Sequence, residues 1–198
     1  MSKKCWQQSL NQALHRRTNA ERSLRVAFVG IGNELCGDDA AGVQLARELK
    51  LRLGFIEDIL VISAGSAPEN CTGSLRRFAP DLVILLDAAQ MGEKPGTVRW
   101  IPWHTSIDIC HSTHTLPLNV IASCLIAELG CEVGLLGIQP LTLDFGDMTP
   151  ILRERVNQTA RAIAELILDA NAGEAGALGV HVSSVTSQHV PSMEMAGA

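Results

Sequence analysis

The sequence predicts an α/β fold, a three-layer sandwich in which helices cover both faces of a mixed, mostly parallel sheet of about five strands. Short, nearly continuous aliphatic segments recur along the chain, as is typical of strands covered on both faces. Segments of helical periodicity separate most of them, and this alternation favours parallel pairing. At 198 residues, with 46% hydrophobic positions, the chain is long enough to bury one sizeable core.

Five segments are expected to form the sheet. Four are aliphatic enough to be buried parallel strands, namely residues 24–30, 58–64, 81–88 and 131–138. The fifth, "TVRWIPW" at 97–103, follows the third strand after little more than the turn "MGEKPG". That connection is too short for a parallel crossover, so this strand is expected to run antiparallel.

Four helices are expected in the remaining intervals, at residues 42–53, 66–78, 118–129 and 149–170. Gly54 is placed to end the first helix. Ser66 stands three residues before Glu69 in the form of a capping box, which marks the start of the second. In the third, apolar residues recur at three- and four-residue intervals, as on a helix that docks against a sheet.

We expect one α/β domain over residues 24–170, a basic extension over 1–23 that is partly helical at most, and a flexible tail over 171–198. The first 25 residues carry six lysines and arginines against one glutamate, diluted by Gln, Asn and Ser, so no nucleic-acid partner is expected. No segment has the apolar length of a membrane span or the pattern of a secretory signal. No membrane partner is therefore expected. The six cysteines lack a C-x-x-C pair, which favours reduced thiols in a cytoplasmic protein.

Ligands of open α/β sheets bind beyond the carboxyl ends of the parallel strands, and strand one ends there in "GIGNELCGDDAAG". A dinucleotide fingerprint would need a glycine where Leu35 stands. Asp38 and Asp39 also place two negative charges at the helix start, where a phosphate would otherwise bind. Asp38 is interpreted as a helix cap, whereas a cap and a functional role are equally favoured for Asp39.

Two more polar residues are expected at this edge. Asp87 follows the buried strand "DLVILL", where a carboxylate must be solvated, paired or bound to a cation, although a turn-forming role is also open. His114 lies in "HSTHTLPLN" before the third helix, where it could also be only a polar residue ahead of a cap at Thr115. Two carboxylates and an imidazole would suit a divalent transition metal with positions left open for another ligand.

The sequence resembles the hydrogenase maturation endopeptidases, which trim the large subunit of nickel-iron hydrogenases. Four motifs carry the resemblance in the same order along residues 26 to about 167: "VGIGNELCGDDAAG", "LLDAAQMGEKPG", "THTLPLN" and "LGIQP". The motifs "GSAPEN", "THTLPLN" and "GIQP" together look most like the formate-hydrogenlyase, or hydrogenase 3, branch. The position after the acidic pair, often glycine in the family, is Ala40, and both terminal segments are extra.

The resemblance implies that Asp39, Asp87 and His114 contact the metal, that Asp38 is their neighbour, and that Asp39 and Asp87 are the catalytic carboxylates of an aspartic-type peptidase. It implies that the nickel arrives with the substrate rather than as a cofactor of the enzyme. The substrate would be the nickel-loaded precursor of the large subunit, from which a C-terminal peptide is removed. The resemblance also implies a monomer that forms only a transient complex with its substrate.

Three other hypotheses stay open. Cys36 could act as a nucleophile with His111 or His114 as its base, and Cys110 is a second candidate nucleophile. A nickel-binding maturation chaperone or sensor could use the same three ligands without hydrolysis. A nucleotide-binding role is the third hypothesis.

Overall fold

The computed structural model describes the backbone of residues 5–15, 23–102 and 117–177, with side chains to residue 170. Its α-helices, strands and two 3₁₀ helices (η) are α1 (Trp6–His15), β1 (Val26–Ile31), η1 (Gly37–Ala40), α2 (Ala41–Leu53), β2 (Ile59–Gly65), η2 (Pro68–Cys71), α3 (Thr72–Phe78), β3 (Leu82–Ala88), β4 (Val98–Pro102), α4 (Leu118–Leu129), β5 (Glu132–Ile138) and α5 (Pro150–Ala177). None of these helices is long and apolar enough to cross a membrane.

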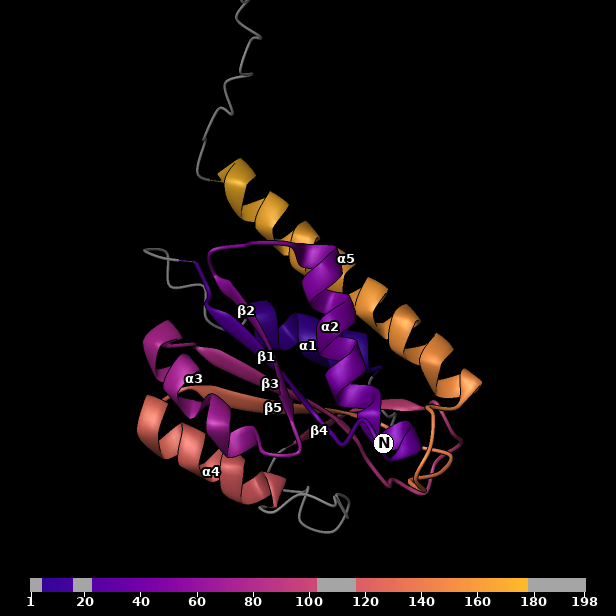
Figure 1. Cartoon of the computed structure of the whole chain (residues 1–198). Coiled ribbons are helices and arrows are strands. Elements are labelled where there is room, and N and C mark those ends of the chain that lie inside the picture. Colours follow the sequence, from indigo (N-terminus) through magenta and orange to yellow (C-terminus); the bar gives the residue numbers. More distant parts are fainter. Residues whose placement is uncertain (1–4, 16–22, 103–116, 178–198) are drawn as a thin grey trace, which may run out of the picture.

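The five strands form one sheet in the order β2-β1-β3-β5-β4. β1, β2, β3 and β5 pair in parallel, whereas β4 pairs antiparallel with β5. The predicted mixed, mostly parallel sheet is confirmed, as is the antiparallel direction of the strand at 97–103. Because the four parallel strands share one direction, their carboxyl ends meet at one edge, toward the lower right of Figure 1.

Helices cover both faces of the sheet, so the sandwich has three layers (Figure 1). Alternate residues of β1 divide between two cores, as the two-residue period of a strand requires. Val26 and Phe28 pack with buried residues of α1, α2 and α5, whereas Ala27 and Val29 pack with those of α3 and α4. Both faces of the central strands are therefore buried from solvent, which explains why the sequences of these strands are continuous aliphatic runs.

Helices occupy parts of both terminal segments. α1 lies within the predicted basic extension, and its Leu10 and Leu14 are buried in the core that α2 and α5 also line. α5 continues to Ala177, past the predicted end at residue 170. Residues 178–198 lie outside the described part of the chain, so the structure leaves most of the predicted tail untested.

The predicted capping box at Ser66 is wrong. The residue before η2 is Ala67, and no side chain caps this short helix. Pro68 is its first residue and has no amide hydrogen that would need an acceptor, which removes part of the need for a cap. The hydroxyl of Thr72 instead donates to the carbonyl oxygen of Glu69, at 3.0 Å.

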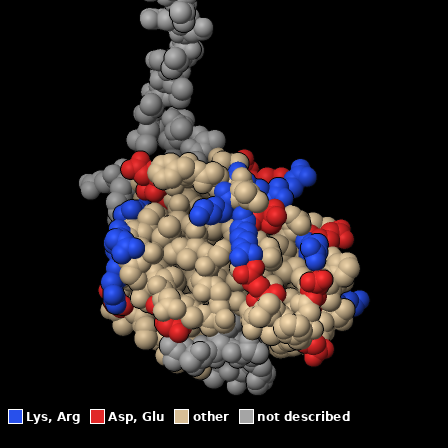
Figure 2. All heavy atoms as spheres, viewed as in Figure 1, with Lys and Arg blue, Asp and Glu red and all other residues tan. Residues whose placement is uncertain are grey.

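Charged side chains are interspersed on the face of the molecule shown in Figure 2, with lysines and arginines beside aspartates and glutamates. Uncharged residues occupy most of the area between them. No charged surface of a single sign extends across the described residues of this face.

Candidate active site

The chain reverses sharply where β1 ends, and glycine is required for this turn. Gly32 has a φ of 143°, and a Cβ atom there would lie 1.9 Å from the backbone oxygen of Asp39. The turn then closes on itself, because the Asn33 amide donates to Oδ2 of Asp39 at 2.8 Å. Backbone contacts thus hold Asp39 over the end of β1.

The start of α2 presses directly on the ends of two strands. A Cβ atom on Gly42 would lie 2.0 Å from the backbone oxygen of Leu86 in β3 and 2.3 Å from that of Ile31 in β1. Asp39 precedes Gly42 by three residues and Asp87 follows Leu86. The close packing at Gly42 therefore brings residues 33–39, which we call the acidic turn, to the edge of the sheet where Asp87 lies.

The two predicted catalytic carboxylates are both withdrawn from solvent. Asp39 is 1% exposed and Asp87 is fully buried. Asp87 lies in β3 opposite Gly137 of β5, so it occupies the centre of the sheet edge rather than its margin. Burying a carboxylate costs free energy unless hydrogen bonds or a cation compensate it, and two such residues at one edge mark a site.

Asp38 was expected to cap the helix that begins beside it, and this expectation is wrong. No side chain caps η1 or α2. The buried carboxylate of Asp38 accepts hydrogen bonds from the backbone amides of Leu141 and Thr149, each at 2.8 Å, and from the Thr149 hydroxyl at 2.8 Å. Asp38 thus secures the loop between β5 and α5, and its partners stand more than 100 residues away, where no local pattern could reveal them.

Backbone hydrogen bonds join the acidic turn to that same loop. The Gly146 amide donates to the Leu35 carbonyl and the Gly37 amide to the Gly146 carbonyl, both at 2.9 Å. The Asp38 amide also donates to the Thr142 carbonyl at 3.2 Å. We call residues 33–38 and 140–149 together the paired loops. They form one side of the sheet edge that carries Asp39 and Asp87.

Gln139 holds the segment that follows Asp87. This residue of the "LGIQP" motif is 5% exposed. Its side-chain oxygen accepts from the amides of Met91 and Glu93, at 2.7 and 3.2 Å. Its nitrogen donates to the Gln90 side chain and to the Pro140 carbonyl. Gln139 had no predicted role, although its position as a polar residue directly after a buried strand was the signal that could have identified it.

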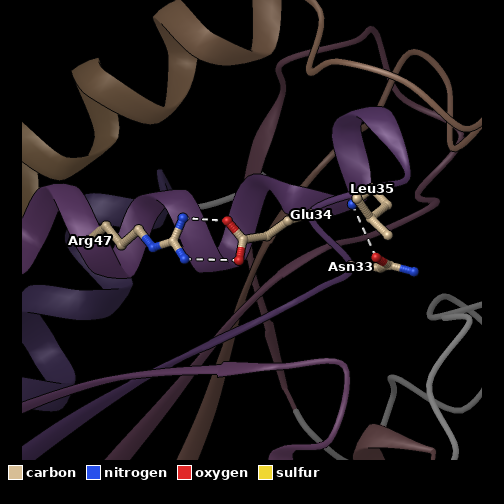
Figure 3. Close-up of polar contacts among 4 residues, drawn as sticks. All are labelled: Asn33, Glu34, Leu35 and Arg47. Atoms are coloured by element: carbon tan, nitrogen blue, oxygen red, sulfur yellow. Dashed lines mark hydrogen bonds and ion pairs between the residues drawn. The ribbon is translucent and has the colours of Figure 1, made fainter.

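Glu34 and Arg47 pair across the outer side of the acidic turn (Figure 3). Both nitrogen ends of the Arg47 guanidinium contact the Glu34 carboxylate, one of them at 2.8 Å. The side chain of Asn33 accepts from the Leu35 amide at 3.0 Å, an Asx turn that stiffens the same segment. Both members of the ion pair are half exposed, so the pair orients the turn more than it stabilises the fold.

A cavity of about 340 Å³ lies between α2 and α5. Gln44, Glu48, Arg153 and Asn157 are among its lining residues, whereas Asp39 and Asp87 do not line it. Glu34 and Asp147 also line the cavity, so it reaches the paired loops but neither of the two buried carboxylates.

His114, the third predicted metal contact, lies outside the described residues, as do His111 and Cys110. Within the described part of the chain, no group of three or more His, Cys, Asp or Glu residues could hold a metal ion. Cys36 is half buried in the acidic turn, and the histidines proposed as its base lie outside the described residues as well.

Comparisons with known proteins reveal clear relatives. The sequence model of the hydrogenase maturation protease family, HycI, matches residues 43–170. The hydrogenase 3 maturation protease of Escherichia coli K12 is 38% identical over 116 residues, which cover 58% of this chain and 72% of that protein. The crystal structure of the [NiFe] hydrogenase maturation protease HycI from Thermococcus kodakarensis KOD1 has a TM-score of 0.71 at 32% identity, and covers 81% of this chain and 99% of that one. The solution structure of the endopeptidase HycI from E. coli has a TM-score of 0.62 at 32% identity, over 70% of this chain and 88% of that one.

Proposed function

The chain belongs to the hydrogenase maturation protease family, and we propose that Asp39, Asp87 and His114 form the site at which it removes a C-terminal peptide from a nickel-loaded hydrogenase large-subunit precursor. The observation that carries this proposal is the pair of buried carboxylates, with Asp87 near the carboxyl end of β3 and Asp39 in η1, which follows the neighbouring parallel strand β1. We further propose that the enzyme acts in the cytoplasm as a monomer that meets its substrate transiently.

The chemistry of the three side chains suits a nickel ion that arrives with the substrate. Carboxylate oxygens and an imidazole nitrogen bind divalent transition metals, and three protein ligands leave positions for donors of the precursor. The buried setting of Asp39 and Asp87 strengthens their attraction for a cation, because little water competes there. A precursor without nickel would present no such cation, so the site would discriminate loaded from unloaded substrate.

Peptide hydrolysis at this site would proceed by direct attack of water. Nickel held beside the scissile bond would polarise its carbonyl, and one carboxylate would accept a proton from the attacking water. The water oxygen then bonds to the carbonyl carbon, the C–N bond breaks, and the proton passes to the leaving amine. The sequence has no serine in a G-x-S-x-G elbow, which favours this course over an acyl-enzyme.

The test compares nickel-loaded with nickel-free precursor and weighs the products by mass spectrometry. We expect loss of a C-terminal peptide from the loaded form alone. Asp39→Asn, Asp87→Asn and His114→Ala should each lower the rate by at least about 100-fold, because each removes a metal contact. Asp169→Asn is the matched control, since Asp169 is an exposed carboxylate of α5 outside the site, and it should cleave at the wild-type rate.

Other outcomes would favour the competing functions. Normal cleavage by both Asp87→Asn and His114→Ala would refute the site. Loss of cleavage in Cys36→Ser, with correct folding, would favour the cysteine mechanism. Tight nickel binding by the isolated protein without any shortening of the precursor would indicate a chaperone or sensor.

A further inference from the structure

Three large apolar side chains project into solvent from the paired loops. Leu35, Leu141 and Phe145 are 63%, 59% and 82% exposed. Single exposed apolar residues are common on protein surfaces, but a group of them on adjoining segments marks an interaction site. Leu35 and Phe145 adjoin because the Leu35 carbonyl accepts the amide of Gly146, the residue after Phe145. The backbone of Leu141 is held beside the acidic turn, because its amide donates to the Asp38 carboxylate.

This apolar surface is held rigidly. The fully buried carboxylate of Asp38 fastens both ends of the 141–149 segment, and the backbone bonds at Gly146 fasten its middle. The Asx turn at Asn33 and the Glu34–Arg47 pair fix the other loop (Figure 3). A surface that is already ordered loses little conformational entropy when a partner binds, so even a small contact area can contribute to affinity.

We propose that Leu35, Leu141 and Phe145 form the docking surface for the folded body of the precursor large subunit, separate from the peptide that is cut. This inference rests on the proposed function. Leu35 stands four residues before Asp39, in the turn whose Asn33 amide bonds to the Asp39 carboxylate. A folded protein that delivers a peptide bond and its nickel to this edge therefore meets the paired loops beside the site.

The charges around this surface define the matching partner surface. Asp144 and Asp147 are exposed in the same loop, and the acidic turn contributes Glu34, which Arg47 partly neutralises. The complementary surface is an apolar patch bordered by lysines or arginines. Three side chains make a small contact, which suits a short-lived enzyme–substrate complex rather than a permanent dimer.

Phe145→Ser, Leu35→Ser and their double variant test the proposal in steady-state cleavage of the nickel-loaded precursor. We expect KM to rise about 5-fold in each single variant and more in the double variant, with kcat within about 2-fold of the wild type, because truncating an interface anchor costs binding energy. Phe55→Ser is the matched control. Phe55 is 94% exposed beyond the far end of α2, and its loss should leave KM unchanged.

A second measurement separates binding from chemistry. In the inactive Asp87→Asn background, the precursor should bind more weakly to the Phe145→Ser form than to the Phe55→Ser form. An unchanged KM in the double variant, with wild-type enzyme active, would refute the docking surface while the proposed function stands. Failure of the wild type to cut loaded precursor would refute the proposed function itself. Sedimentation that shows a wild-type dimer and a monomeric double variant would reassign the surface to self-association.

Discussion

Replacing Asp38 with alanine should cost more stability than replacing any exposed carboxylate of the paired loops. The substitution removes the acceptor for three donors held at 2.8 Å, the amides of Leu141 and Thr149 and the Thr149 hydroxyl. An unsatisfied buried donor costs about 1–3 kcal/mol. Water can reach part of the exposed loop and replace some of these bonds, so we expect a net loss of about 3–4 kcal/mol in the free energy of unfolding.

Asp38→Asn separates the shape of the side chain from its charge. The amide has the same shape and keeps one acceptor oxygen, but its NH₂ group would face donors, so about half of the loss is expected. Asp144→Ala is the control in the same loop. Asp144 is exposed and accepts one side-chain hydrogen bond, from Thr142, so its loss should cost less than about 1 kcal/mol.

Urea unfolding followed by circular dichroism measures these differences. The slope of free energy against urea should stay constant, since the three variants expose the same surface on unfolding. Because the same bonds hold the turn that carries Asp39, cleavage by Asp38→Ala should also fall under conditions in which the protein remains folded. If Asp38→Ala loses no more stability than Asp144→Ala, the hydrogen bonds of Asp38 do not fasten the paired loops.

Two further predictions concern packing and ionisation. Gly42→Ala should lose about 1–3 kcal/mol of stability and much of the cleavage activity, because the new methyl group would overlap the Leu86 carbonyl. Gly73→Ala in α3 is the control, because its new methyl group would lie 3.8 Å from the Arg77 guanidinium, and it should unfold at the same or higher urea concentration. Equal losses of stability in both variants would contradict the close approach at Gly42. Burial raises the pKa of the Cys71 thiol from 9.0 to about 11. The unfolded thiol ionises first, so stability should fall as pH rises from about 9 to 11, and Cys71→Val should lose part of this pH dependence; an identical dependence in both proteins would contradict it.

The central strands β1, β3 and β5 could be predicted because they are short and buried on both faces. Because both of their faces are buried, these strands need continuous aliphatic runs, such as "LVILL" in β3. The direction of β4 followed from chain length alone, since the connection from β3 has no room for a crossover. Only a partly helical extension could be expected around α1, because its buried residues, Leu10 and Leu14, are few among many polar ones.

The site was predictable only where residues and strand ends coincide. Asp87 could be selected as a candidate because it directly follows an aliphatic run, where a buried carboxylate is costly. Asp38 could not be assigned, because its donors lie in a loop that only the folded sheet brings beside it. The same limit applies to Gln139, whose partners come from the loop after β3.

The bonds of Asp38 also have a consequence for how the protein is made. The amide that Asp38 holds at Thr149 lies 111 positions further along the chain. During synthesis the acidic turn therefore emerges from the ribosome long before the loop that fastens it, and the turn cannot reach its final geometry until residue 149 is free to return to it. The protease should thus gain its activity only after the segment around residue 149 has left the ribosome.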